Sequence, residues 1–203
     1  IYLKEREPAL RDRIVQRLIE DSRVDQVLWR SAAWNPAGDT REKSVDDSFV
    51  VARSGSGRLR FRRATSDDDA SAKDDYGTSW VLEGDLDCID ARVAGARIQY
   101  GEYPNALERI ATGFCTNAED LWVTARIGYE FEIAETSIHD GGSHGALNRD
   151  DSTPPLIIAG LPDDIAVPEH PRTIDLAPLC LSALGLKNQA EDLINCRHAG
   201  KPA

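Results

Sequence analysis

The stretch Ser48-Phe-Val-Val-Ala-Arg-Ser-Gly-Ser-Gly-Arg-Leu-Arg-Phe-Arg-Arg63 predicts a β-hairpin. Two runs of strand-forming residues flank a Gly/Ser turn at 54–57, which is the pattern of antiparallel strands joined by a short loop. In the second run, alternation places Arg58, Arg60 and Arg62 on one strand face, with Leu59 and Phe61 on the other. We interpret the arginines as a solvated strand face. The alternative is a local basic patch for an anionic partner.

On the N-terminal side of the hairpin, Pro8 introduces an amphipathic helical pattern, and a β-branched run follows at Val24–Arg30. A helix followed closely by a strand is a step typical of α/β proteins. On the C-terminal side, residues 66–75 form an acidic loop, which we interpret as solvated rather than as a calcium site, because it lacks the central Gly and final Glu of an EF-hand. The pattern of residues 48–103 as a whole predicts a β-rich segment that is inserted into the domain or forms a cap on it.

Two near-continuous apolar runs in the last third, Asp120–Ala125 and Leu156–Ala159, predict strands that are buried on both faces, as in parallel sheets. Residues 173–184 predict a helix that ends at Gly185. The expected fold is therefore α/β, with a mostly parallel sheet flanked by helices and a local antiparallel hairpin. Residues 1–203 would form a single domain or the C-terminal part of a larger one.

Composition narrows the classes of partner. The 203 residues carry 24 Lys and Arg against 35 Asp and Glu, a net charge of −11 that disfavours binding to nucleic acid or anionic lipid. No apolar run approaches the roughly 20 residues of a membrane span, so we expect a soluble chain without membrane insertion. We favour a cytoplasmic location. The alternative is a secretory leader that has been removed. Because the chain starts at Ile1 and has no Met, we expect a segment before it.

The run Asp140-Gly-Gly-Ser-His144-Gly145, preceded by His139, is the most specific functional mark. One carboxylate and two imidazoles close together in sequence are a credible ligand set for a divalent metal, zinc above all. The glycines let the backbone approach a ligand closely. The alternative is a surface turn in which both histidines are solvated.

Three pieces in this order resemble the alkaline phosphatase superfamily, and most closely its type I phosphodiesterase/nucleotide pyrophosphatase-like branch. They are Ser143-His144-Gly145, Pro155-Leu-Ile-Ile158, and Arg172-Thr-Ile-Asp-Leu-Ala-Pro-Leu-Cys-Leu-Ser-Ala-Leu-Gly185. The resemblance covers residues 119–186 and implies an incomplete alkaline-phosphatase-like core. It makes His144 a metal ligand, with Asp140 and His139 as further ligands or as partners that orient His144.

The chain departs from this family after the strand at 121–125. Arg126 and Ile127 stand where the family has a metal-binding Asp and His, and no N-terminal segment resembles the region of the family's nucleophile. Arg126 would then offer a fixed positive charge to the substrate where a cation sat. Glu130 is a more distant candidate ligand, or simply a solvated carboxylate.

Two functions compete. The first is the C-terminal portion of a metal-dependent phosphatase or phosphodiesterase, acting on a small phosphoester or sulfate ester together with an N-terminal half that this chain lacks. The second is a non-catalytic relative, a binding or scaffolding protein, which the Arg126-Ile127 departure favours. A plain α/β domain with a coincidental resemblance is the third.

Overall fold

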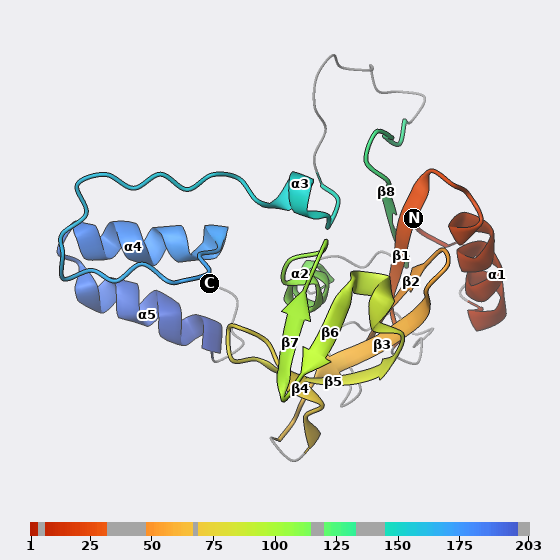
Figure 1. Cartoon of the computed structure of the whole chain (residues 1–203), viewed down its shortest axis with the longest axis horizontal. Coiled ribbons are helices and arrows are strands. Elements are labelled where there is room, and N and C mark those ends of the chain that lie inside the picture. Colours follow the sequence, from red (N-terminus) through yellow and green to blue (C-terminus); the bar gives the residue numbers. More distant parts are fainter. Residues whose placement is uncertain (4–6, 32–47, 67–68, 115–119, 133–144, 199–203) are drawn as a thin grey trace. The chain divides into compact units, whose positions relative to one another are not determined.

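The computed structural model describes residues 1–3, 7–31, 48–66, 69–114, 120–132 and 145–198. The chain separates into two units, Ile1–Pro154 and Pro155–Ala203 (Figure 1).

The first unit contains an eight-stranded sheet with helices α1 (Pro8–Ile19), η2 (Leu86–Ile89), α2 (Ala106–Gly113) and α3 (Arg149–Ser152). Its strands are β1 (Val24–Arg30), β2 (Phe49–Arg53), β3 (Gly57–Arg63), β4 (Ala72–Lys73), β5 (Ser79–Gly84), β6 (Ala91–Ala94), β7 (Arg97–Tyr100) and β8 (Trp122–Ala125). They lie in the order β6-β7-β4-β5-β3-β2-β1-β8. The segment 48–103 supplies β2 to β7, which share this sheet with β1 and β8.

The sheet is mostly antiparallel. Among the described strands only β4 and β7 run parallel, where Lys73 meets Arg97; the other neighbouring strands pair antiparallel. The prediction of a mostly parallel sheet is therefore wrong, and so is the parallel core that the resemblance implied. The two apolar runs behind that prediction are not buried on both faces, because all four residues of β8 are partly exposed and residues 156–159 form no strand. Strand direction depends on the connections, and a tight turn can only reverse the chain.

The predicted hairpin is confirmed. β2 and β3 pair in register from Phe49 opposite Phe61 to Arg53 opposite Gly57. Leu59 and Phe61 are buried, whereas Arg58, Arg60 and Arg62 keep part of their surface in solvent, so the predicted alternation of the two faces also holds. Each fully buried side chain of this size contributes roughly 1.5–3 kcal/mol of hydrophobic free energy.

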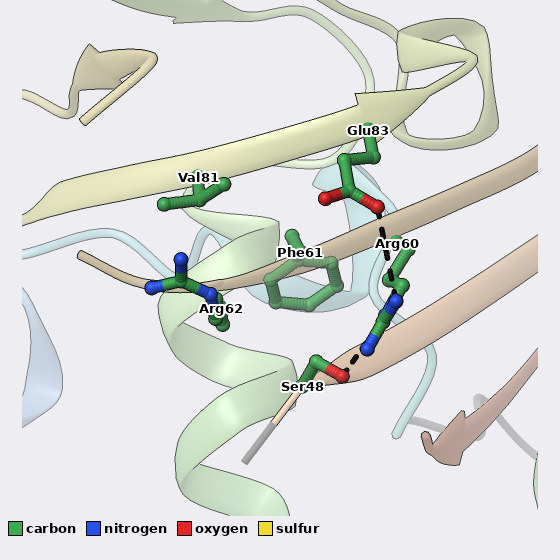
Figure 2. Close-up of a pocket in the computed structure, with 6 residues that line it drawn as sticks. All are labelled: Ser48, Arg60, Phe61, Arg62, Val81 and Glu83. Atoms are coloured by element: carbon green, nitrogen blue, oxygen red, sulfur yellow. Dashed lines mark hydrogen bonds and ion pairs between the residues drawn. The ribbon is translucent and has the colours of Figure 1, made fainter. Parts of the chain in front are cut away.

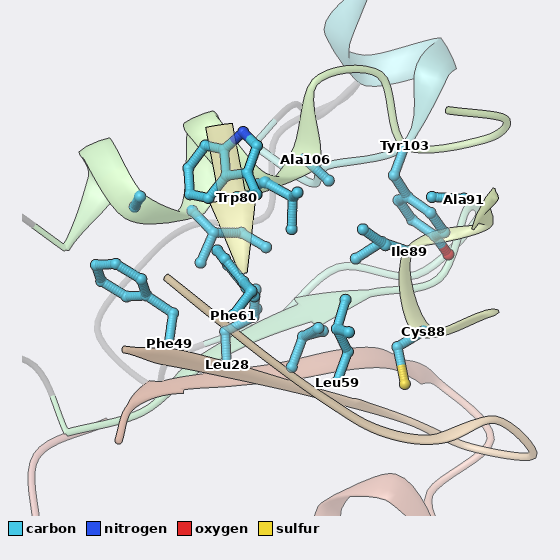
Figure 3. Packing of buried hydrophobic residues seen from close by; sticks show 14 of the residues in the cluster. Leu28, Phe49, Leu59, Phe61, Trp80, Cys88, Ile89, Ala91, Tyr103 and Ala106 are labelled. Carbon is cyan, nitrogen blue, oxygen red and sulfur yellow. The ribbon is translucent and has the colours of Figure 1, made fainter. Parts of the chain in front are cut away.

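The larger core lies between the sheet and the elements η2 and α2 (Figure 3). Its aromatic rings contact one another: the centroid of Phe61 lies 5.6 Å from that of Phe49 and 5.8 Å from that of Trp80. From α2 come Ala106, Leu107, Ile110 and Ala111. This helix therefore presents one apolar face to the sheet.

A smaller core covers the opposite face, where α1 lies against β1 and β2 (Figure 1). Val15 of α1 is buried together with Val27 and Trp29 of β1. The guanidinium groups of Arg11 and Arg58 lie 5.7 and 5.4 Å from the Trp29 ring centre, so two cations contact one indole. β1 and β2 are consequently covered on both faces.

The second unit contains η3 (Thr173–Asp175), α4 (Leu176–Ala183) and α5 (Lys187–His198). The predicted helix at 173–184 is confirmed, with the Asp175 carboxylate accepting from the Arg172 backbone N–H at 2.8 Å and Gly185 following at a φ of +79°. The predicted strand at Leu156–Ala159 is wrong: no strand forms there, and Ile157 is 87% exposed. Among the described residues of this unit no strand exists for it to pair with.

Gly84 and Gly95 form a matched pair for testing the sheet. Both have a positive φ, +106° and +60°, but a Cβ at Gly84 would collide with the carbonyl oxygen of Arg58, whereas nothing lies within 4 Å of one at Gly95. We expect Gly95→Ala to cost about 1–2 kcal/mol, the strain of a left-handed L residue. Gly84→Ala should cost more than about 3 kcal/mol, because β3 and β5 must also separate.

Urea unfolding of both variants measures the difference. Equal losses of unfolding free energy would show that β3 and β5 do not approach each other as described.

Candidate functional site

The predicted metal ligands His139, Asp140 and His144 lie outside the described residues. Gly145, the next described residue, has a φ of +124°, a backbone conformation that glycine adopts without strain. The last glycine of the run therefore occupies a position that other residues rarely tolerate.

The chain that follows Gly145 is firmly attached to the first unit. Leu147 is buried in the larger core, and the Arg109 guanidinium donates to the carbonyl oxygens of Leu147 at 2.8 Å and Ala146 at 3.2 Å. The Asn148 side chain accepts from the Asp151 backbone N–H at 2.9 Å and so caps α3. Desolvation lowers the pKa of Arg109, and two carbonyl acceptors offset part of the cost of burying this cation.

Arg126 lies directly after β8, and its Nε donates to the Val24 carbonyl oxygen at 3.2 Å. Its backbone N–H donates to the Arg23 carbonyl oxygen at 2.8 Å. Ile127 is exposed and Gly128 turns the chain with a φ of +88°. The guanidinium of Arg126 thus fastens the end of β8 to the start of β1.

A buried polar group that sequence reasoning missed lies where β1 and β8 pair irregularly. The register shifts between Val24 and Gln26, which leaves Asp25 as the extra residue of a β-bulge. The hydroxyl of Tyr103 lies 2.7 and 2.9 Å from the two Asp25 carboxylate oxygens, and Arg53 Nε lies 3.4 Å from one of them. The Arg53 guanidinium also lies 5.1 Å from the Tyr103 ring centre. Three side chains from distant segments therefore form one charge-compensated contact.

Gln26 and Cys88 extend this polar group into the core. The Gln26 side-chain amide donates to the Cys88 carbonyl oxygen at 2.8 Å, while its Oε1 is buried without a hydrogen-bond partner. Burial raises the pKa of the Cys88 thiol to about 11. Because the thiolate is the reactive form, the raised pKa disfavours reaction at Cys88 near neutral pH.

Burial, and then the hydrogen bond to Asp25, raises the pKa of Tyr103 above its ordinary value. Tyr103 stays a neutral hydrogen-bond donor at physiological pH. The arrangement of Asp25, Arg53 and Tyr103 thus holds β1, β2 and the segment before α2 together, and it offers no activated nucleophile. Its only sequence signal is the pair Asp25-Gln26 within a strand whose other residues, apart from the terminal Arg30, are apolar.

The arginine face of β3 is matched by carboxylates. The shortest nitrogen–oxygen distances are 3.4 Å from Arg58 to Asp12, 3.8 Å from Arg60 to Glu83 and 2.8 Å from Arg62 to Asp69. The Arg62 guanidinium lowers the pKa of Asp69 to about 2. A face compensated in this way agrees with the solvated-strand interpretation and does not suit an extended polyanion.

Two carboxylates of the acidic loop at residues 66–75, Asp69 and Asp74, accept hydrogen bonds from other groups of the protein. Asp69 binds Arg62, and Asp74 accepts from the indole N–H of Trp80 at 2.8 Å as well as from the backbone N–H groups of Tyr76 and Thr78. Within the described ranges no group of three or more His, Cys, Asp or Glu side chains is arranged to hold a metal ion. In the same ranges no helix is long and apolar enough to cross a bilayer.

No family model matches this chain. Searches of curated proteins and of solved structures likewise give no match. The resemblance noted from residues 119–186 therefore stays a proposal.

Tyr103→Phe tests the buried polar contact. Removing the hydroxyl leaves the Asp25 carboxylate short of a donor, so we expect a loss of about 1–3 kcal/mol in unfolding free energy at pH 7. Tyr129→Phe is the control, since Tyr129 is exposed and should change stability by less than about 0.5 kcal/mol.

The Tyr103→Phe variant should also change how the stability of the protein depends on pH. A pKa that is raised in the folded state contributes stability below the ordinary tyrosine pKa of about 10, and this contribution is lost as the pH rises further. The wild type should therefore lose stability faster than Tyr103→Phe above pH 10 in urea titrations. Parallel pH curves would contradict the burial of this hydroxyl.

Proposed function

We propose that the chain is the C-terminal portion of a metal-dependent hydrolase of phosphoesters or sulfate esters, with His144 as a metal ligand. The observation that carries the proposal is the run Asp140–Gly145, followed in order by the segments 155–158 and 172–185. Two local features support it. Pro178 lies in the first turn of α4, which ends before Gly185, and the residues after His144 are anchored to a buried core.

The donor set fits zinc in its chemistry. Imidazole nitrogens from His139 and His144 and a carboxylate from Asp140 are ligand types that zinc accepts. A bound zinc ion would supply Lewis acidity to an ester oxygen. The chain's own contribution is positional: Gly145 allows a tight turn, and Arg109 fixes the carbonyls of the next two residues.

The three proposed metal ligands do not identify the substrate or the nucleophile. We infer a small phosphoester or sulfate ester as substrate, and we assign the nucleophile to a separate N-terminal half that would act as a partner. Arg126 is the proposed substrate contact. It is exposed, although its Nε already donates to the Val24 carbonyl oxygen.

A non-catalytic binding protein is the second candidate. Arg126 and Ile127 favour it, because the first is fastened to the backbone of β1 and the second is an exposed apolar side chain. Neither residue type offers a ligand atom for a second divalent metal.

Replacement of His144 tests the metal proposal. We expect His144→Ala to weaken zinc binding by at least about 100-fold in equilibrium dialysis, since even indirect partners of metal ligands change affinity 10–100-fold. His170→Ala is the matched control, because His170 is an exposed histidine of the second unit.

Hydrolysis of bis(p-nitrophenyl) phosphate separates the two candidates. Zinc-dependent turnover that requires His144 supports the hydrolase, whereas zinc retention without turnover, also after the upstream half is supplied, supports the binding protein. Equal zinc affinity in wild type and His144→Ala would reduce the run to a glycine-rich turn.

A further inference from the structure

The sheet ends at β8, whose outer edge has no partner strand in the described part of the chain (Figure 1). Strands inside the sheet are paired along both edges: Figure 2 shows β3 between β5, which carries Val81 and Glu83, and the start of β2 at Ser48. An unpaired edge presents backbone N–H and C=O groups with which another extended chain can pair.

One residue of an extended chain already pairs with this edge. The Ile1 nitrogen donates to the carbonyl oxygen of Leu121, the residue before β8, at 2.8 Å. In return, the Leu121 N–H donates to the Ile1 carbonyl oxygen at 3.2 Å. Two residues that exchange both hydrogen bonds form a pair of an antiparallel ladder. Ile1 therefore fixes the direction in which a further strand would run along β8.

The same pair shows which backbone groups of β8 point outward. Backbone groups of successive strand residues point alternately to the two sides of the strand, so those of Val123 and Ala125 point outward as those of Leu121 do. The alternate set points to β1, since the Arg126 N–H donates to the Arg23 carbonyl oxygen at 2.8 Å. Val123 and Ala125 thus offer two N–H donors and two C=O acceptors on the outer edge.

The side chains of β8 do not protect this edge. Its sequence, Trp122-Val-Thr-Ala125, contains no charged residue and no proline, the residue types that commonly discourage pairing at an edge. All four residues are partly exposed. Trp122 packs against the larger core and Val123 against the smaller one. An added strand would therefore cover apolar surface on both faces.

We propose that the outer edge of β8 binds an extended, uncharged peptide segment of a partner protein as an added antiparallel strand next to Ile1. Hydrogen bonds to the backbone of Val123 and Ala125 would supply affinity, and small apolar side chains opposite them would supply specificity. Opposite residues of a ladder share one face, so the partner's side chain opposite Val123 lies beside the smaller core. A charged side chain there would lie against apolar surface.

A second copy of the chain fits this edge less well. Each copy carries a net charge of −11, so two copies repel each other, whereas an uncharged peptide is not repelled. Pairing of two β8 strands would also join only four residues of each copy, far fewer than the 20–30 residues a side of a stable interface. The proposed surface contains none of the proposed metal ligands and does not depend on the proposed hydrolase.

The peptide acetyl-Thr-Val-Thr-Val-Thr-amide tests the edge in a titration of the full chain followed by amide NMR. We expect a dissociation constant on the order of 1 mM, the affinity of a few backbone hydrogen bonds on a short ladder. The Val123 and Ala125 amides should also exchange with D₂O about sixfold more slowly when the peptide concentration is about five times the dissociation constant.

N-methylated peptides provide a matched pair that leaves the protein unchanged. Methylation of the second valine nitrogen removes the donor to the Val123 carbonyl oxygen and places a methyl group between the strands, so binding should weaken at least about tenfold. Methylation of the middle threonine nitrogen is the control. Its N–H points away from β8, so the affinity should stay within about twofold.

Val123→Pro tests the protein side of the ladder. It removes the outward N–H but no hydrogen bond to β1, and an edge strand tolerates proline at such a position. We expect peptide binding to weaken at least about tenfold, whereas Val123→Ala, which keeps the N–H, should weaken it less than about threefold.

Absence of binding by the unmethylated peptide overturns the proposal, as does equal weakening by the two N-methyl groups. Concentration-dependent dimerisation that Val123→Pro abolishes, measured by sedimentation, would also overturn it and would assign the edge to a second copy.

Discussion

The burial of β1 and β2 on both faces is the constraint on which the first unit depends. Leu28 and Val51 point into the larger core, and Val27 and Ala52 into the smaller one. Neither face can be left in water without losing several fully buried apolar side chains, each worth a few kcal/mol. The sheet therefore requires α1 on one side and α2 with η2 on the other.

Local patterns in the sequence predicted local structure well. The hairpin at 48–63 and the helix ending at Gly185 are confirmed, because alternation, a Gly/Ser turn and a stop glycine act over a few residues. The parallel sheet was wrong because neither apolar run on which it rested is buried on both faces: all four residues of β8 are partly exposed, and residues 156–159 form no strand. The strand at 156–159 was wrong because an apolar run forms a strand only where another strand can pair with it.

The candidate sites also differ in whether they depend on neighbouring residues in the sequence or on the pairing of distant segments. The glycine and histidine run is visible as a motif because its members are adjacent in sequence. The contact between Asp25 and Tyr103 joins residues 78 positions apart, and only a bulge in the ladder between β1 and β8 aims the carboxylate at the tyrosine. A register shift of this kind depends on which strands pair, which one chain's pattern does not reveal. The arginine face lies between these cases: its alternation was predictable, its carboxylate partners were not.

The pairing of β8 with β1 also has a consequence for the order in which the sheet assembles. β2 and β3 are joined by a turn of a few residues, whereas β8 meets a strand that lies about a hundred residues earlier in the chain. Closing so long a loop costs more chain entropy than closing a hairpin and slows the step that requires it. The edge at β8, together with the bulge and the contact of Asp25, is therefore the part of the sheet expected to form last and to open first.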